Sequence, residues 1–243
     1  MRQPFGGIKK SAIGFGRKVG IYNYITQFLD ISQIKADSNL AQSPISKGIE
    51  SLLAQNNFSQ KEALQTALIM AQSYAYHKAN EFDLAKDYVS IRGEENLFSY
   101  TKIKNMAYRI CDDDELSDIL GIIIGANVLE IPLLVSSDSM QECAIKICDD
   151  LGLKADFIKE GAKDFALKIP DFERVRYHAK ANKDDVIYKC ASANAKIIIA
   201  TKPLINGRFE LLYYHNEKSL SISYHRYGNL GIRGVECAES SRI

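Results

Sequence analysis

Long apolar runs, net charge and paired cysteine motifs are all missing from this sequence. No apolar run reaches the length of about 18 residues that a transmembrane helix needs, so we expect no membrane span. The formal charge is only +1, from 31 basic and 30 acidic residues, and this balance favours neither nucleic acid nor an anionic membrane as a partner. The five cysteines form no CxxC pair, and the amino terminus lacks the apolar segment of a secretion signal. We therefore expect reduced thiols in a cytoplasmic protein.

A phosphate-binding GxGxxG turn is also missing. Gly14, Gly16 and Gly20 do not have that spacing, and no predicted strand precedes them. The glycine-rich segment 1–28 therefore predicts an irregular loop that packs on another surface, with a nucleotide site as the alternative. No residue of the sequence is predicted to hold a metal ion or a cofactor.

The segment 112–157 contains the most apolar run and predicts the core of an α/β layer. In chain order, its patterns predict a helix from 112–115 to Gly125, a strand over 128–135, a helix from Ser139 to Gly152 and a strand over 155–158. The second helix should bury one stripe, formed by Met140, Cys143, Ala144, Ile147, Cys148 and Leu151. Such a unit implies parallel strands joined by right-handed crossovers.

Further elements are expected on both sides of this core. Residues 30–43 read as a linker, and the segment 44–90 is helical, with Leu64, Leu68, Ala71, Ala75 and Phe82 as the stripe of its long helix. Strands are expected at 96–100, 106–110, 172–178 and 196–201, with a helix over 184–193. The alternation continues the parallel sheet.

The last part of the chain changes to an alternating pattern. Segments 208–215 and 220–227 predict a β-hairpin through a turn at 216–219. An acid/base cluster at 225–227 is an alternative to an interface there, but no partner carboxylate or nucleophile lies at a telling spacing. Likewise, Arg92 beside Glu94 and Glu95 indicates an ion-paired loop, with a site as the alternative.

Several motifs together resemble a known family. RQPFGG (2–7), KKSA (9–12) and NYITQF (23–28) are similar to the last segment of the aldehyde dehydrogenase domain of proline utilization A. AQSYAY (71–76), IRGEENLFSY (91–100) and SLSISYHRYGNLG (219–231) follow in the order of the carboxy-terminal region of that family's long members. The resemblance thus covers almost the whole chain.

The resemblance implies a part of a bifunctional enzyme. Its full-length members join an FAD-dependent proline dehydrogenase to an NAD-dependent L-glutamate γ-semialdehyde (1-pyrroline-5-carboxylate) dehydrogenase. The catalytic cysteine and glutamate would lie before Met1, so this segment is expected to be inactive alone and to hold no cofactor. Phe5 matches the aromatic that walls the aldehyde pocket, which makes it the one substrate-binding residue carried over. The implied partners are the upstream catalytic domains or a second copy of the chain.

The resemblance also implies that the second half is a degenerate copy of a dinucleotide-binding domain. GANVLEIPLLVSS (125–137) is similar to the superfamily strand that ends in K-P-S, but the lysine that meets the adenine ribose is replaced here. The expected fold is α/β, with a Rossmann-like parallel sheet, flanking helices, a preceding helical segment and a carboxy-terminal β-hairpin flap. The expected divisions are a dehydrogenase tail (1–29), the linker (30–43), the helical segment (44–90) and the carboxy-terminal domain with its flap and tail (91–243).

Two classes of function compete on these patterns. The first is a non-catalytic covering and assembly segment of the proline-oxidising enzyme, and the second is a free-standing nucleotide-binding α/β enzyme. A third alternative is a partner that acts in trans on a split dehydrogenase.

Overall fold

The computed structural model describes residues 4–7, 11–12, 15–20, 23–29, 31, 35, 38–55, 60–91, 93–179 and 185–223. The chain forms two compact units, each built from separate stretches of sequence. Unit 1 takes Met1–Leu29, Phe82–Thr101 and Asn216–Ile243, and unit 2 takes Asp30–Glu81 and Lys102–His215. The expected tail 1–29 thus shares a unit with parts of the expected carboxy-terminal domain, and the expected helical segment 44–90 belongs mostly with the parallel sheet. In the described part of the chain, no helix is long and apolar enough to cross a membrane.

Unit 2 contains a five-stranded parallel sheet in the order β5-β4-β3-β6-β7. Its strands are β3 (Met106–Arg109), β4 (Leu133–Ser137), β5 (Asp156–Lys159), β6 (Arg174–Tyr177) and β7 (Ile197–Ile199). The connections are α4 (Leu116–Val128), α5 (Glu142–Leu151), α6 (Ala162–Lys168) with η3 (Ile169–Asp171), and α7 (Val186–Ala193). The chain begins in the middle, runs outward to β5, and crosses back to β6 and β7. This order confirms the Rossmann-like sheet.

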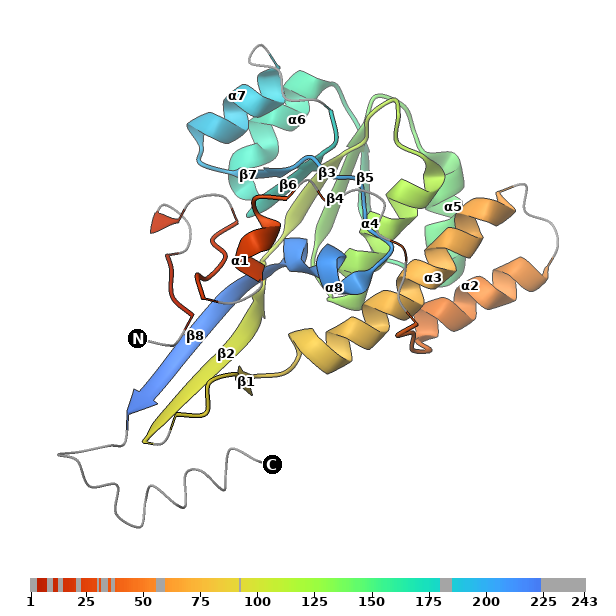
Figure 1. Cartoon of the computed structure of the whole chain (residues 1–243). Coiled ribbons are helices and arrows are strands. Elements are labelled where there is room, and N and C mark those ends of the chain that lie inside the picture. The colour runs from red at the N-terminus through yellow and green to blue at the C-terminus, as the bar shows by residue number, and fades with distance from the viewer. Residues whose placement is uncertain are drawn as a thin grey trace. The chain divides into compact units, whose positions relative to one another are not determined.

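Helices cover both faces of this sheet (Figure 1). On the α6/α7 face, Ala107, Leu134 and Val175 pack with Phe165 and Ile187 in one buried cluster. Because side chains alternate along a strand, Arg174 and Arg176 of β6 point to the opposite face, toward α4. That face therefore receives two fully buried arginines.

The helices that precede the sheet pack on this second face. Ser43 caps α2 (Pro44–Ala54), because its side chain accepts a hydrogen bond from the backbone nitrogen of Ser46 at 3.1 Å. Next comes α3 (Lys61–His77), which continues as the π-helical turn η2 (Lys78–Phe82) and packs on α2, α4 and α8 (Gly207–Glu210). Its buried side chains are Leu64, Ala67, Met70, Ala71, Ser73, Tyr74 and His77. Leu68 and Ala75 are only half-buried, so the expected stripe is rotated by about one residue.

Unit 1 contains a three-stranded sheet in the order β1-β2-β8, formed by β1 (Lys86–Asp87), β2 (Glu94–Lys102) and β8 (His215–Ser223). Two side-chain contacts show that β8 runs against β2. Thr101 donates to the carbonyl of Asn216 at one end, and Ser221 donates to Asn96 at the other. The amino-terminal segment of the unit includes the short helix α1 (Asn23–Thr26).

The buried carboxylate of Glu217 on β8 holds this amino-terminal segment. It accepts hydrogen bonds from the backbone nitrogen of Lys18 at 2.5 Å and from the side-chain amide of Asn23 at 3.0 Å. The expected loop at the amino terminus therefore does pack on another surface of the chain.

The expected hairpin over 208–227 is wrong in its first half. Residues 207–214 are helical, as α8 followed by the 3-10 turn η4 (Leu211–Tyr214), and β8 then pairs with β2 instead. The physical reason is tertiary: Asn206 caps α8 by accepting from the backbone nitrogen of Arg208, and buried groups of β6 bind this segment. Residues 224–227 lie outside the described part of the chain.

The expected end of the first core helix at Gly125 is also wrong. Helix α4 continues to Val128, and β4 begins only at Leu133. A Cβ atom on Gly125 would lie 2.8 Å from the hydroxyl of Tyr214. Gly125 therefore allows a close approach inside the helix and does not terminate it.

The expected start and stripe of the next helix need correction too. Helix α5 begins at Glu142 and not at Ser139, while Met140 is 48% exposed and Cys143 is exposed. The end is as predicted, because Gly152 adopts the left-handed conformation with φ of 64°.

Candidate functional site

The carboxyl edge of the parallel sheet is the place where a doubly wound fold binds its ligands. The crevice opens where neighbouring strands continue in opposite directions along the sheet. Here that point lies between β3 and β6, which are adjacent and parallel. The residues that follow these two strands, 110–115 and 178–179, therefore form the candidate site.

Carboxylates occupy the turn between β3 and α4. Its sequence is Ile-Cys-Asp-Asp-Asp-Glu, without glycine. The side chain of Asp114 accepts hydrogen bonds from the backbone nitrogen of Cys111 at 2.8 Å and from the hydroxyl of Tyr108 at 2.7 Å. Glu115 and Asp118 form a reciprocal capping box on α4. The helix end that would attract a phosphate is thus already bound by the chain's own carboxylates.

His178, the residue directly after β6, contacts this turn. Its Nδ1 atom lies 2.5 Å from the carboxylate of Asp114, and both side chains are buried. On the other side of the ring, Nε of Arg176 donates to Nε2 of His178 at 3.3 Å. Arginine cannot accept a hydrogen bond, so Nε2 carries no proton and Nδ1 donates to Asp114.

These contacts set the acidity of Asp114. Burial raises its pKa, but hydrogen bonds from His178, from the backbone of Cys111 and from Tyr108 outweigh burial and hold the pKa below its ordinary value. The group is therefore a bound anion and not a proton donor at neutral pH.

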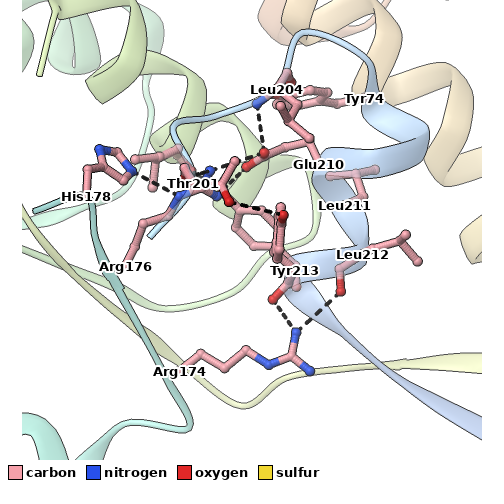
Figure 2. Close-up of polar contacts among 12 residues, drawn as sticks. Tyr74, Arg174, Arg176, His178, Thr201, Leu204, Glu210, Leu211, Leu212 and Tyr213 are labelled. Carbon is pink, nitrogen blue, oxygen red and sulfur yellow. Dashed lines mark hydrogen bonds and ion pairs between the residues drawn. The ribbon is translucent and has the colours of Figure 1, made fainter. Parts of the chain in front are cut away.

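A fully buried ion pair lies next to His178, as Figure 2 shows. Arg176 and Glu210 both have fully buried side chains and meet at 2.5 Å and 3.2 Å through two guanidinium nitrogens. Burial lowers the pKa of Arg176, but the charge of Glu210 raises it by more. The pKa of Arg176 therefore lies above its ordinary value, and the pair stays charged. Arg176 also donates to the carbonyl of Thr201, and Glu210 accepts from the backbone nitrogen of Leu204 at 2.9 Å. The pair therefore ties the segment 201–210 to the sheet.

Arg174 binds the next part of the same segment (Figure 2). Its guanidinium donates to the carbonyls of Leu212 at 3.3 Å and of His215 at 2.8 Å, and also to that of Tyr213. These are the carbonyls that a short helical turn leaves unpaired at its end. Two arginines of one strand thus fix both α8 and η4.

A third buried arginine fills the edge beyond β4 and β5. Arg109 donates to the hydroxyl of Ser136 at 3.0 Å and to the carbonyl of Glu160 at 2.6 Å, and pairs with Asp138 at 2.5 Å. Ser136 and Asp138 stand where a dinucleotide-binding fold meets the adenine ribose. The groups that could bind a ribose here already bind Arg109.

Two cysteines of unit 2, Cys111 and Cys148, are poor nucleophiles. Burial and the charge of Asp114 raise the pKa of Cys111 to about 11, and burial raises the pKa of Cys148 to about 12. Among the described residues, no group of three metal-ligating side chains occurs. Cys111, the cysteine of this turn, is therefore not an activated nucleophile.

The residues that the sequence singled out lie elsewhere. Phe5 is in unit 1, where its side chain is 56% exposed and its backbone pairs with Val19. Its role in an aldehyde pocket stays a prediction. Arg92 and residues 225–227 lie outside the described residues, and Glu94 contacts the side chain of Asn96. Sequence reasoning missed Arg174, Arg176 and His178, although charged residues inside an apolar strand pattern were a signal.

Comparisons with known proteins extend this picture. No family model and no curated protein matches the sequence. Among solved structures, proline utilization A from Corynebacterium freiburgense matches with a TM-score of 0.60 and 24% identity, over 93% of this chain and 19% of that chain. The fold is similar to one part of proline utilization A. This chain thus spans about a fifth of that protein's length.

Two other solved structures match more weakly. Proline utilization A from Bdellovibrio bacteriovorus has a TM-score of 0.40 with 8% identity, over 55% of this chain and 16% of that one. The Delta-pyrroline-5-carboxylate dehydrogenase from Mycobacterium tuberculosis has 0.46 with 13%, over 66% and 35%. Neither likeness is strong enough to support an argument about this chain.

Proposed function

We propose that this chain is a non-catalytic covering and assembly segment of a bifunctional enzyme that oxidises proline to glutamate through 1-pyrroline-5-carboxylate. The observation that carries the proposal is the filled carboxyl edge. The turn 110–115 presents carboxylates where a pyrophosphate would need backbone donors, and Arg109 occupies the groups that would meet a ribose. The likeness to part of proline utilization A supports the same choice.

In this proposal, NAD and FAD belong to the catalytic parts of the enzyme. A dinucleotide has no free helix end to bind here, because Asp114, Glu115 and Asp118 surround that end with negative charge. Unit 1 would supply the contact with the catalytic part. Its described residues expose Phe28 and Leu29 at the amino-terminal segment and Leu220 and Ile222 on the edge strand β8.

Reconstitution tests the proposal directly. The chain, alone and mixed with a recombinant upstream half, is assayed for oxidation of glutamate semialdehyde with NAD. We expect no turnover by the chain alone, and we expect the mixture to form a complex in which the upstream half is more active or more stable. A matched variant introduces two positive charges on β8, Leu220→Lys with Ile222→Lys, and should prevent the complex. Turnover by the chain alone, or no complex with the upstream half, would contradict the proposal.

A free-standing nucleotide-binding enzyme is the second candidate. Asp138 favours it, because an acidic residue just after the second strand is where such folds bind a ribose hydroxyl. Its carboxylate is 75% exposed but is paired with Arg109. This candidate therefore requires that pair to open, and it predicts saturable NAD binding. The trans-acting partner of a split dehydrogenase differs from our proposal only in how the two halves are encoded.

A further inference from the structure

A cavity of about 690 Å³ lies in unit 2, where α3, the start of α4 and the segment after β7 come together. A second cavity of about 500 Å³ shares Thr66, Glu115 and Ser117 with it and extends to the start of α3. The two cavities therefore form one groove on the α3 side of the carboxyl edge. Each volume lies in the range of sites that bind small molecules.

Part of the larger cavity is lined by buried apolar side chains. Met70 of α3 and Leu204 of the segment after β7 line it, and each is only 2% exposed. Pro203 adds a further apolar surface. These side chains favour a small apolar group, because its burial removes apolar area from water.

Two lysines also line the larger cavity. Lys202 donates to the carboxylate of Asp118 at 2.8 Å and to the carbonyl of Asp113 at 2.6 Å. The hydrogen bond to Asp118 raises the pKa of Lys202, so its ammonium is charged at neutral pH. An ammonium has three N–H groups, so one is left for a ligand. Lys35 is exposed, and its ammonium has no partner among the residues that the structure describes.

Negative charge lines the same cavity through Glu115 and Asp118. Asp118 is already the partner of Lys202 and also accepts from the backbone nitrogen of Glu115 at 3.0 Å. Glu115 is exposed and belongs to no ion pair within the described part of the chain. Because Lys202 and Asp118 neutralise each other, the charges left over are those of Lys35 and Glu115, one of each sign.

The remaining polar groups of the groove add no net charge. Thr66 and Ser117 line both cavities, and neither hydroxyl has a hydrogen-bond partner among the described residues. Lys61 and Glu62 line the smaller cavity with one charge of each sign. The groove therefore suits a ligand that itself carries one positive and one negative charge.

We propose that this groove binds a zwitterionic amino acid with an apolar side chain. Lys35 and the remaining N–H of Lys202 bind the carboxylate, Glu115 binds the ammonium group, and the side chain packs on Met70 and Leu204. The carboxylate does not go to the end of α4, because that end carries negative charge of its own. The site lies entirely within unit 2, so it does not depend on the proposed contact of unit 1 with a catalytic part.

Titration of the whole chain with L-leucine, followed by the shifts of its backbone amide signals, tests the proposal. Up to about 10 mM, at which a site with a Kd of about 1 mM is nine-tenths occupied, we expect saturable shifts at 115–118 and 200–205 and none in α6. Two analogues each lack one charge: 4-methylpentanoate has no ammonium group, and 3-methylbutylamine has no carboxylate. Each should bind at least about tenfold more weakly than leucine, because each loses a charged hydrogen bond.

Variants of exposed side chains assign the two ends of the ligand. Lys35→Gln should weaken leucine about tenfold and leave 3-methylbutylamine unchanged, whereas Glu115→Gln should weaken leucine and leave 4-methylpentanoate unchanged. The matched control is Lys154→Gln, at an exposed lysine that lines a different cavity at the starts of β4 and β5, and it should not affect leucine.

Four results overturn the proposal. They are no saturable shift with leucine, shifts outside the groove only, an analogue that binds as tightly as leucine, and a loss in Lys154→Gln equal to that in Lys35→Gln. The first three come from the wild-type chain, so they do not depend on how any variant folds.

Discussion

The two units differ in the side chains that they bury and in those that they expose. Unit 2 closes the carboxyl edge of its sheet with its own buried charges, as in the pairs Arg176–Glu210 and His178–Asp114. Unit 1 is smaller but exposes more large apolar side chains among its described residues, namely Phe5, Ile25, Phe28, Leu29, Leu84, Tyr88, Leu220 and Ile222. In unit 2 the corresponding set is Leu40, Ile69, Met140, Leu167 and Val186. The contrast supports the proposal that unit 1, and not the Rossmann-like sheet, supplies the contact with a partner.

Breaking the buried ion pair should have the largest effect on unit 2. Glu210→Ala leaves Arg176 buried and unpaired, which should lower the free energy of unfolding by about 3–5 kcal/mol. Urea denaturation followed by circular dichroism measures this. The control Lys102→Ala breaks an exposed pair with Glu130 and should cost at most about 1 kcal/mol. Equal losses in the two variants would mean that unit 2 does not depend on its internal charges.

Removing apolar surface from unit 1 should change association. Phe28 is 68% exposed, and burying such a side chain in an interface is worth about 1.5–3 kcal/mol. We expect Phe28→Ser to weaken self-association of the chain, or its complex with a catalytic half, by at least about tenfold. Light scattering and sedimentation check it. The control is Leu167→Ser, which removes a 79% exposed leucine of unit 2 and should change nothing.

Adding a methyl group at Gly125, where the helix lies close to Tyr214, should have a smaller effect on the stability of unit 2. The change should destabilise the unit, although glycine to alanine usually stabilises a helix. Alanine normally stabilises a helix interior relative to glycine by about 1 kcal/mol. Gly125→Ala should instead destabilise unit 2 by about 1–3 kcal/mol, because its Cβ would meet the buried ring of Tyr214. Gly48→Ala in α2 is the control, since its Cβ would meet only the end of the flexible Leu151 side chain. Thermal unfolding that shows the same shift for both variants would contradict the close-approach explanation.

Acid should remove a small part of the stability of unit 2. The pKa of Asp114 is lower in the folded chain than in the unfolded chain. Its contribution is therefore complete above the unfolded value of about 3.9 and is lost as the pH falls below that. Asp114→Asn should flatten stability against pH below about 4, whereas Asp113→Asn at its exposed neighbour should not. Urea midpoints measured from about pH 2.5 to 7 decide between these outcomes.

Local patterns predicted the sheet well, because its elements are set by short-range signals. The strands at 106–110, 155–158 and 172–178 and the cap at Ser43 follow from apolar runs and a capping residue. The errors occurred where distant contacts decide the structure. The pattern of 208–214 alternates like a strand, but Arg174 and Arg176 hold it as helix.

The candidate site could not be predicted from the sequence, because its contacts join residues that lie far apart in the chain. His178 lies 64 positions from Asp114, and Arg176 lies 34 positions from Glu210. Nothing local to either residue indicates its partner. The acidic turn 112–115, by contrast, is visible in the sequence, but it was interpreted only as a helix start.

Calorimetric titration of the whole chain with NAD tests the central claim most directly, namely that the carboxyl edge is filled by the chain's own charges. At NAD concentrations up to about 1 mM, a range in which even weak sites saturate measurably, we predict no saturable heat, and no change when Asp138 is replaced by Ala. Saturable heat that disappears in Asp138→Ala would show that the pair with Arg109 opens for a ribose. That result would contradict the account and favour a nucleotide-binding enzyme.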